Sequence, residues 1–308
     1  MAGALIIRHE RVCAAALAAV LACAATSVSF HWWPDHSNDV EILWHAGRML
    51  RQGMDPYPLA PQFSRWPLYY PLPAVLLALP LTLLSFHGAS VVWVGFIAGA
   101  FAWALSTRGR WALLALLSGA SVHALANGQS TPLLVAAAIL PGWGGLFTIK
   151  PNTGLAMFAA YPTKSAVIGS LVILIVSVAV LPAWPVEWLR TIRDAPHIVA
   201  PISRPFGWLL LLAGIRWRDP RARLLLALAI IPQNLLPHET VALALVPRNV
   251  VEMGIYVVGS WIALLAVSAH APVGTAADLH LLVEAVWPYM LACIYLPMLW
   301  LVLRSPRS

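Results

Sequence analysis

Charged residues are scarce in this sequence of 308 residues, at 10% of the total. Soluble domains carry about 25% charged residues, so the composition excludes an ordinary soluble protein. Hydrophobic residues make up 60% of the chain, and the mean hydropathy is +0.79. The long apolar runs lack the alternation of barrel strands, which favours membrane helices. We therefore expect an all-α fold, a polytopic transmembrane helical bundle.

Cysteine is also rare, with three residues in the chain. Cys13, Cys23 and Cys293 all lie in apolar runs, and none belongs to a CxxC pair. We interpret them as small buried hydrophobic residues without a chemical role. The sequence also lacks a P-loop, a dinucleotide-binding fingerprint and a nucleophile elbow.

Acidic residues are outnumbered, and the formal net charge is +7 at pH 7. The arginines are spread over short loops between apolar runs, so we expect them to set topology and contact membrane lipids, with no nucleic-acid partner. Arg8 and Arg11 precede the first apolar run. We interpret that run as a retained transmembrane helix that starts in the cytoplasm, although a cleaved signal peptide is an alternative.

About eight to ten spans are expected from the lengths of the apolar runs, in a single integral membrane domain over residues 1–308. After the first span, the apolar runs that we interpret as full or short spans cover residues 70–86, 88–105, 111–125, 132–147, 166–181, 206–215, 224–236, 250–267 and 281–303. Strict alternation places Arg108 and Arg110 outside, whereas the positive-inside rule places them inside. One short span between Tyr70 and Leu105 would then not cross the membrane fully.

Two polar loops are expected on the extracytoplasmic side, at residues 34–69 and 183–205. In the first, Asn38 or Asp39 can cap a helix that runs to about Gln52. Polar residues recur on one face of this helix and apolar residues on the other. We expect an amphipathic helix that lies on the membrane surface.

The first loop contains a series of motifs that continues into the next apolar run: Asp39, Trp44-His45-Ala46-Gly47, Gly53-Met54-Asp55-Pro56-Tyr57 and Tyr69-Tyr70-Pro71-Leu72-Pro73. In this order they resemble the first extracytoplasmic loop of glycosyltransferase family 87, which belongs to the GT-C class. Gly128-Gln129-Ser130 and Lys150-Pro151 resemble two later elements of the family, and Pro237-His238 resembles a third in part.

The resemblance implies an inverting, mannosyltransferase-like enzyme of the cell membrane with a GT-C-like fold. Its active site would face the extracytoplasmic side. It would transfer mannose or arabinose from a polyprenyl-phosphate donor to a glycolipid or cell-envelope glycan acceptor. A donor with a single phosphate implies no metal and no further cofactor, and the trio Asp35, His36 and Asp39 is a weak metal signal.

Sugar transfer to an alcohol needs a carboxylate to accept the acceptor's proton and cations to hold the leaving phosphate. Asp39 is the candidate base, with a helix cap as its alternative role; Asp35 is the reserve. Arg48 and Arg51 are candidates for the donor phosphate, or for lipid headgroups. Tyr57 is a candidate substrate ligand, with a structural role in the turn Asp55-Pro56-Tyr57 as its alternative.

Five further residues are candidate substrate ligands. Tyr70 can line a sugar pocket. Gln129 either binds sugar hydroxyls or joins two helices, and Lys150 is either a phosphate ligand or a cytoplasmic anchor. His238 and Glu239 form an ionisable pair between apolar runs, where such residues are functional candidates.

Two other functions fit the same sequence. One is a transporter or flippase for lipid-linked sugars, which commonly shows two matching halves; no internal repeat is visible. The other is a catalytically inactive membrane scaffold of a cell-envelope complex, which the incomplete Pro237-His238 element would fit.

Overall fold

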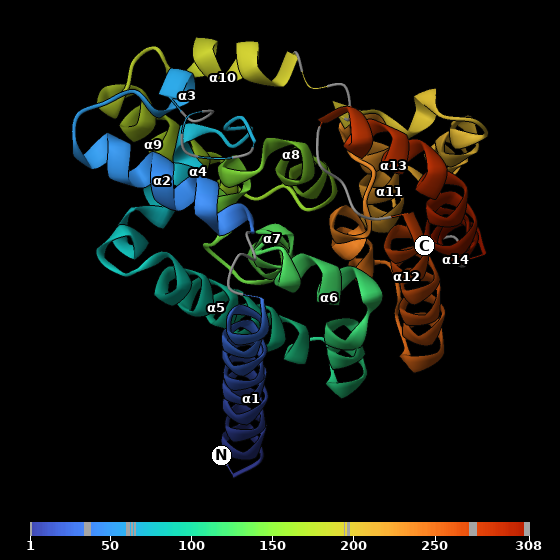
Figure 1. Ribbon diagram of the computed structural model, residues 1–308. Coiled ribbons are helices and arrows are strands. Elements are labelled where there is room, and N and C mark those ends of the chain that lie inside the picture. Colours follow the sequence, from blue (N-terminus) through green and yellow to red (C-terminus); the bar gives the residue numbers. More distant parts are fainter. Residues whose placement is uncertain are drawn as a thin grey trace.

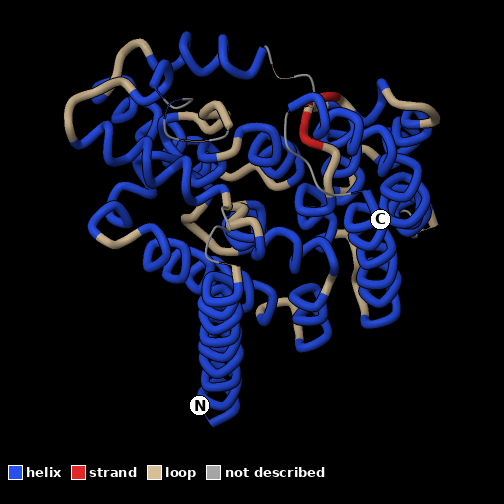
Figure 2. The backbone as a smooth tube through the Cα atoms, in the orientation of Figure 1, coloured by secondary structure: helices blue, strands red, loops and turns tan. Residues whose placement is uncertain are grey.

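The computed structural model describes residues 2–33, 38–59, 62, 64, 66–193, 195, 198–270 and 276–304, with side chains omitted at residues 2–8 and 276–277. The described chain is mostly helical, as expected for an all-α membrane protein (Figure 2). The strands in the described residues are β1 (Ile198–Val199) and β2 (Gln233–Asn234), which pair antiparallel.

The first part of the chain forms these helices, with short 3₁₀ segments labelled η: α1 (Ala2–Trp32), α2 (Asp39–Arg51), α3 (Pro56–Leu59), α4 (Leu72–Ala78), η2 (Leu79–Leu83), α5 (Phe86–Ser106), η3 (Arg110–Leu117), α6 (Gly119–Ala126), α7 (Thr131–Ile139), η4 (Gly144–Ile149), α8 (Pro151–Ala160), α9 (Lys164–Val180) and α10 (Trp184–Arg193). The remainder forms η5 (Pro201–Ser203), η6 (Gly207–Arg216), α11 (Pro220–Ile230), η7 (Pro237–Leu245), α12 (Val250–His270), α13 (Ala276–Met290), the π-helical turn η8 (Leu291–Tyr295) and α14 (Leu296–Leu303). Helices α11 to α14 gather on one side of the molecule, and α10 lies across the top of the other side (Figure 1).

Among the described residues, four helical segments are long and apolar enough to cross a membrane: His9–Trp32, Phe86–Ser106, Val250–His270 and Asp278–Leu303. A fifth span is possible if α9 and α10 are counted together, although the chain bends by 100° between them. This is fewer than the sequence predicted, because several apolar runs are broken. The run at 111–125 is interrupted at Ser118, whose hydroxyl caps α6, and α7 stops at Ile139, just before Pro141-Gly142.

Helices α1 and α5 pack side by side and run in opposite directions. The ring of Phe30 lies 5.5 Å from that of Phe86, centroid to centroid, and Glu10 forms an ion pair with Arg110 at the other end. Arg108 and Arg110 therefore lie at the same end as the N-terminal part of α1. The apolar segment made by α4 and η2 is too short to be a span, which removes the conflict between strict alternation and the positive-inside rule.

The predicted amphipathic helix is α2, but its apolar face is covered by protein. Val40, Ile42, Leu43, Ala46, Gly47 and Met49 are the buried residues of α2, and the helix packs against α4, η2 and α5. A Cβ at Gly47 would lie 2.7 Å from the Cγ2 of Thr82. The close approach of α2 to η2 favours glycine at this position, and α2 packs into the bundle through its apolar face.

Candidate functional site

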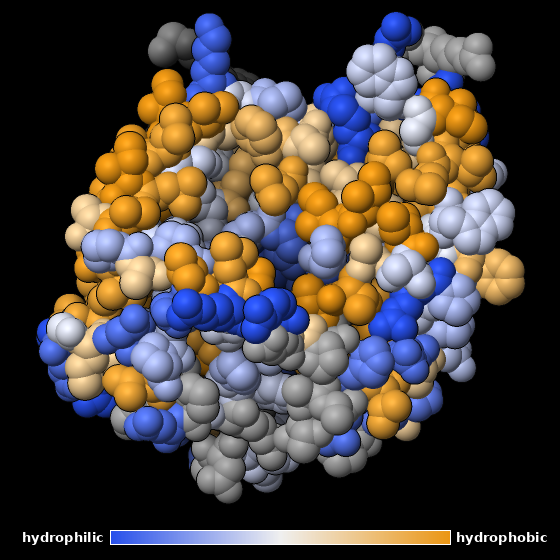
Figure 3. Space-filling view, turned by 90° about the horizontal axis from the view of Figure 1, so that it is seen from above, coloured by the Kyte–Doolittle hydropathy of each residue, from blue (hydrophilic) through white to orange (hydrophobic). Residues whose placement is uncertain are grey.

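A cavity of about 710 Å³ lies beneath α10, and we call it the main cavity. Pockets of roughly 300–1,000 Å³ are typical of small-ligand sites. The residues that line it are Asp39, Tyr69, Tyr70, Pro71, Gln129, Lys150, Pro151, Asn152, Leu155, Trp188, Leu189, Ile192, Arg193, Ile198, Ile231, Pro232, Asn234, His238 and Glu239. From above, hydrophilic atoms lie in a recess with hydrophobic side chains around it (Figure 3).

Asp39 lies at the first position of α2, with its carboxylate in the wall of the main cavity. The helix is capped by Asn38, whose side chain accepts a hydrogen bond from the first turn. The side chain of Asp39 is therefore not the cap. Its Oδ2 accepts hydrogen bonds from the Tyr70 hydroxyl and the Gln129 amide, both at 2.5 Å, and its backbone N–H donates to Asn127 at 3.0 Å.

Gln129 reaches Asp39 because Gly128 precedes it. The backbone of Gly128 has φ +63°, and a Cβ at this position would lie 2.7 Å from the Cγ2 of Val40. The Gly128 carbonyl accepts a hydrogen bond of 2.9 Å from the indole of Trp93. A left-handed backbone at a close approach is a position that favours glycine, which explains the Gly-Gln pair in physical terms.

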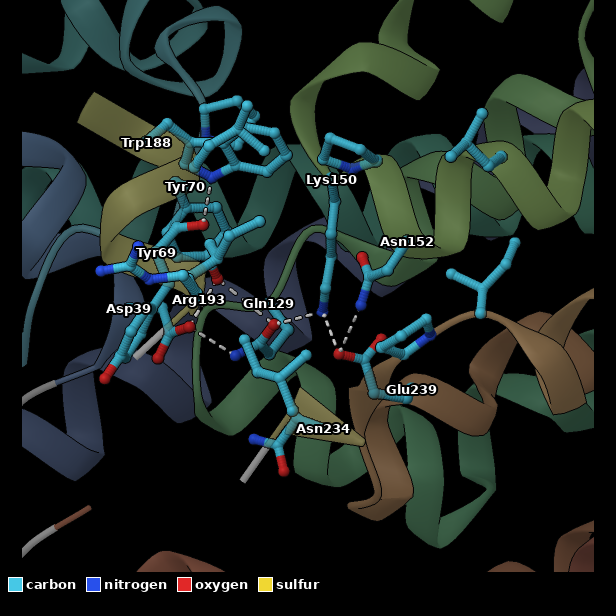
Figure 4. Close-up of a pocket in the computed structure, with 18 of the residues that line it drawn as sticks. Asp39, Tyr69, Tyr70, Gln129, Lys150, Asn152, Trp188, Arg193, Asn234 and Glu239 are labelled. Carbon is cyan, nitrogen blue, oxygen red and sulfur yellow. Dashed lines mark hydrogen bonds and ion pairs between the residues drawn. The ribbon is translucent and has the colours of Figure 1, made fainter. Parts of the chain in front are cut away.

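Lys150 and Glu239 form a buried ion pair across the cavity from Asp39 (Figure 4). The ammonium Nζ lies 3.0 Å from Glu239 Oε1, and it donates to Gln129 Oε1 at 2.8 Å and to Thr131 Oγ1 at 3.1 Å. An ammonium group has three N–H donors, so all three have acceptors. Gln129 thereby joins the ion pair to Asp39, because its oxygen accepts from Lys150 and its nitrogen donates to Asp39.

Two residues of α8 and the adjacent His238 also contact the carboxylate of Glu239. Its Oε2 accepts a hydrogen bond of 3.0 Å from Thr153, and Asn152 donates to Oε1 at 3.5 Å. His238 Nε2 lies 3.7 Å from Oε1, and its Nδ1 lies 3.3 Å from Nδ1 of His123. A buried ion pair that keeps most of its donors and acceptors satisfied is costly to break from one side.

The protonation of the site follows from its burial. Removal from water raises the pKa of Asp39 above its ordinary value, although the Tyr70 hydrogen bond, the Lys150 charge and the Gln129 hydrogen bond each lower it. Burial and the nearby charge of Lys150 hold the pKa of His238 well below its ordinary value. A carboxyl group with a raised pKa is a candidate for proton transfer, and His238 is neutral at neutral pH.

A second cavity, of about 330 Å³, meets the main cavity at Asp39. Both cavities are lined by Asp39, Tyr69, Tyr70, Gln129, Asn234 and His238. Asn234 is placed there by the β1–β2 pair, and its Oδ1 is buried without a hydrogen-bond partner in the described part of the chain. An amide oxygen of this kind can accept a hydrogen bond from a substrate hydroxyl.

Helix α10 supplies the upper wall of the main cavity. Trp188, Leu189, Ile192 and Arg193 line it, and their spacing places them along one side of the helix. The indole of Trp188 donates to the carbonyl of Tyr69 at 2.9 Å, which ties the helix to the segment that carries Tyr70.

The structure brings together six of the residues that the sequence singled out. Asp39, Tyr70, Gln129, Lys150, His238 and Glu239 all line the main cavity. Arg48 and Arg51 do not: Arg48 lies over the ring of Trp44, and Arg51 donates to the Thr82 hydroxyl.

Tyr57 supports the site from outside the main cavity, because its hydroxyl donates to the carbonyl of Tyr70 at 3.1 Å. The carboxylate of Asp55 accepts from the backbone N–H of Tyr57 at 3.0 Å, as expected for a structural turn. Asp35, the reserve base, lies outside the described residues, as does His36.

Sequence reasoning assigned no role to Asn152, Trp188, Arg193 or Asn234. The signal for Trp188 and Arg193 was the amphipathic pattern of residues 184–193, but that pattern does not say what the helix covers. Among the described residues, no group of three or more His, Cys, Asp or Glu side chains is arranged to hold a metal ion. Comparisons with protein-family models, curated proteins and solved structures found no match for this chain.

Proposed function

We propose that this protein is an inverting glycosyltransferase of the GT-C type, which transfers a sugar from a polyprenyl-phosphate donor to a hydroxyl group of a cell-envelope acceptor. One observation carries the proposal. The carboxylate of Asp39, the base that the first-loop motifs predict, lies at the junction of two cavities and is held there by Tyr70 and Gln129.

The chemistry follows from this placement. Asp39 removes the proton from the acceptor hydroxyl as the oxygen attacks the anomeric carbon, the bond from that carbon to the phosphate oxygen breaks, and the lipid phosphate leaves. A single general base suits one displacement with inversion. Glu239 does not serve as a second free carboxylate, because Lys150 neutralises it.

The two cavities offer room for two substrates on either side of the base. The main cavity has the larger volume and an apolar side, which suits the donor. The second cavity reaches Asp39 from the side of Glu41 and Trp66, which suits the acceptor. The proposal places the cavities on the extracytoplasmic face of the cell membrane, opposite the basic N-terminus.

The direct test is sugar transfer from a radiolabelled polyprenyl-phosphate mannose or arabinose, in membranes with matched amounts of protein. We expect Asp39→Asn to lower the rate by about a hundredfold or more, because the substitution keeps the size of the side chain and removes the base. Asp55→Asn is the control, since Asp55 bonds the backbone of its own turn and does not line the cavity.

Equal rates for the wild type and Asp39→Asn would show that Asp39 is not the base. Absence of transfer by the wild type, with both sugars, would instead favour transport of lipid-linked sugars or a scaffold role.

A further inference from the structure

The described residues that line the main cavity include two with cationic side chains, Lys150 and Arg193. Lys150 is paired with Glu239, which also accepts a hydrogen bond from Asn152, whereas Arg193 is drawn on the other side, toward Asp39 and Tyr69 (Figure 4). Lys150 is buried, and its three N–H donors are used by protein acceptors. It cannot bind a substrate anion without breaking the ion pair with Glu239.

Arg193 differs from Lys150 in exposure and in hydrogen-bonding capacity. It is an exposed side chain at the C-terminal end of α10. A guanidinium carries five N–H donors in a planar fork, so it can bind a phosphate while it keeps an interaction with another residue. The imidazole of His238, which also lines the cavity, is neutral and does not supply a competing positive charge.

The depth of α10 relative to the membrane follows from α9. Helix α9 exposes Val167, Ile168, Leu171, Val172, Ile175, Val176, Val178 and Val180, so lipid is the medium that suits its surface. The chain then bends by 100° into α10. With α9 along the membrane normal, this bend turns α10 close to the membrane plane, where an amphipathic helix meets the lipid phosphates.

The cavity wall beside Arg193 is apolar and open. Leu189 and Ile192 line the cavity from α10, and Leu155 lines it from α8. Leu189 is 54% exposed and Leu155 is 57% exposed, so the gap between these helices has an apolar edge. Arg193 therefore lies where the phosphate of a lipid would be, with the hydrocarbon chain of the same lipid against the apolar wall.

We infer that α10 is the binding element for the lipid-phosphate part of the donor: Arg193 binds the phosphate, and Leu189 and Ile192 contact the first isoprenoid units. This inference rests on the proposed function, since it assigns the donor to the main cavity. It assigns the phosphate to a residue outside the first loop, in place of Arg48 and Arg51.

The test measures binding without catalysis, with purified protein in nanodiscs of neutral lipid. The probes are farnesyl phosphate, farnesol and inorganic phosphate. We expect Arg193→Gln to weaken farnesyl phosphate binding by about tenfold or more, as for the loss of a charge-assisted hydrogen bond, and to leave farnesol binding unchanged. Arg193→Lys should restore part of the affinity, because a single charge remains without the fork.

Arg190→Gln is the matched control, three residues away on the same helix. Arg190 forms an ion pair with Glu187 at 2.7 Å and does not line the cavity, so we expect affinity within about twofold of the wild type, as for an exposed ion pair. Ile192→Ala should weaken the binding of farnesyl phosphate and leave the binding of isopentenyl phosphate unchanged, because only the longer chain reaches the apolar wall.

Three results would overturn the inference. The first is wild-type affinity in Arg193→Gln, and the second is an equal loss in Arg193→Gln and Arg190→Gln, which would indicate general surface charge. The third is displacement of bound farnesyl phosphate by inorganic phosphate or phosphatidylglycerol at the same concentrations as by farnesyl phosphate itself, which would indicate an unspecific anion site. Binding that depends on Arg193 in a protein that transfers no sugar would refute the proposed function alone, whereas transfer with binding independent of Arg193 would refute this inference alone.

Discussion

At the scale of single residues, the site is organised by the amide of Gln129. An amide has one acceptor oxygen and one donor nitrogen, and here the oxygen faces Lys150 while the nitrogen faces Asp39. The ion pair of Lys150 with Glu239 therefore determines which atom Asp39 meets. The Gln129 nitrogen thus donates a hydrogen bond to the Asp39 carboxylate and favours its ionised form, which is the form that can act as a base.

The pH dependence of activity tests the role of Tyr70. Asp39 accepts a proton only when ionised, so activity should fall as the pH falls through its raised pKa. The Tyr70 hydroxyl lowers that pKa, so Tyr70→Phe should raise it and move the acidic limb of kcat/KM to higher pH. A hydrogen bond to a charged group contributes about 1.5–3 kcal/mol, which corresponds to roughly 1–2 pH units.

Tyr57→Phe is the control for this experiment, since its hydroxyl donates to a backbone carbonyl and not to the carboxylate. The limb should stay in place in that variant. An unchanged limb in Tyr70→Phe would mean that the group seen in the pH profile is not Asp39.

Sequence patterns identified the buried polar residues of the main cavity better than the residues that α10 contributes to it. Asp39, Gln129, Lys150 and Glu239 are polar groups inside or between apolar runs, and burial forces such groups to find one another. Arg48 lies on a polar helix face, and a helical period cannot say whether that face meets solvent or substrate.

At the scale of elements, α2 and α10 show that an amphipathic pattern does not reveal what a helix packs against. Both helices are amphipathic, and both lie within the two polar loops that the sequence predicts. The apolar face of α2 packs on α4, η2 and α5, whereas one side of α10 lines the main cavity. The difference arises from tertiary packing, which no local pattern encodes.

The turn between α6 and α7 offers a test at this scale. Gly128→Ala should lower the thermal stability, because a left-handed non-glycine residue costs about 1–3 kcal/mol, and it should lower activity further by pushing Val40 and the start of α2 away from Gln129. Gly142→Ala is the matched control, because Gly142 also has a positive φ of +83° but has open space around the added Cβ.

Gly142→Ala should therefore lose stability through backbone strain and keep its activity. Thermal unfolding in detergent and the transfer assay separate the two effects. Equal activity in both variants would show that the close approach of Gly128 to Val40 does not position Asp39.

At the scale of the whole molecule, the helical membrane class followed from composition, and the number of spans did not. The apolar runs at 111–125 and 132–147 are interpreted as spans from their hydropathy, yet Ser118 and Pro141-Gly142 break them into short helices. Length and hydropathy record only the average of a run. Capping residues decide where a helix ends.

The antiparallel packing of α1 and α5 predicts the topology of the first third of the chain. In a variant without native cysteines, Arg110→Cys should react with an impermeant thiol reagent from the same side as a tag on the N-terminus. Gln52→Cys should react from the opposite side, because no candidate span lies among the described residues between α1 and α5. Labelling of both positions from one side would contradict this arrangement.

The buried pair of Lys150 and Glu239 has a consequence for biosynthesis. Lys150 is synthesised well before Glu239, because α9, α10 and α11 are translated between them. Until η7 has been inserted, the ammonium of Lys150 lacks its counterion in an apolar surrounding, and this is costly. A nascent chain stopped after α11 should therefore be degraded faster in a pulse-chase experiment than the same chain with Lys150→Met.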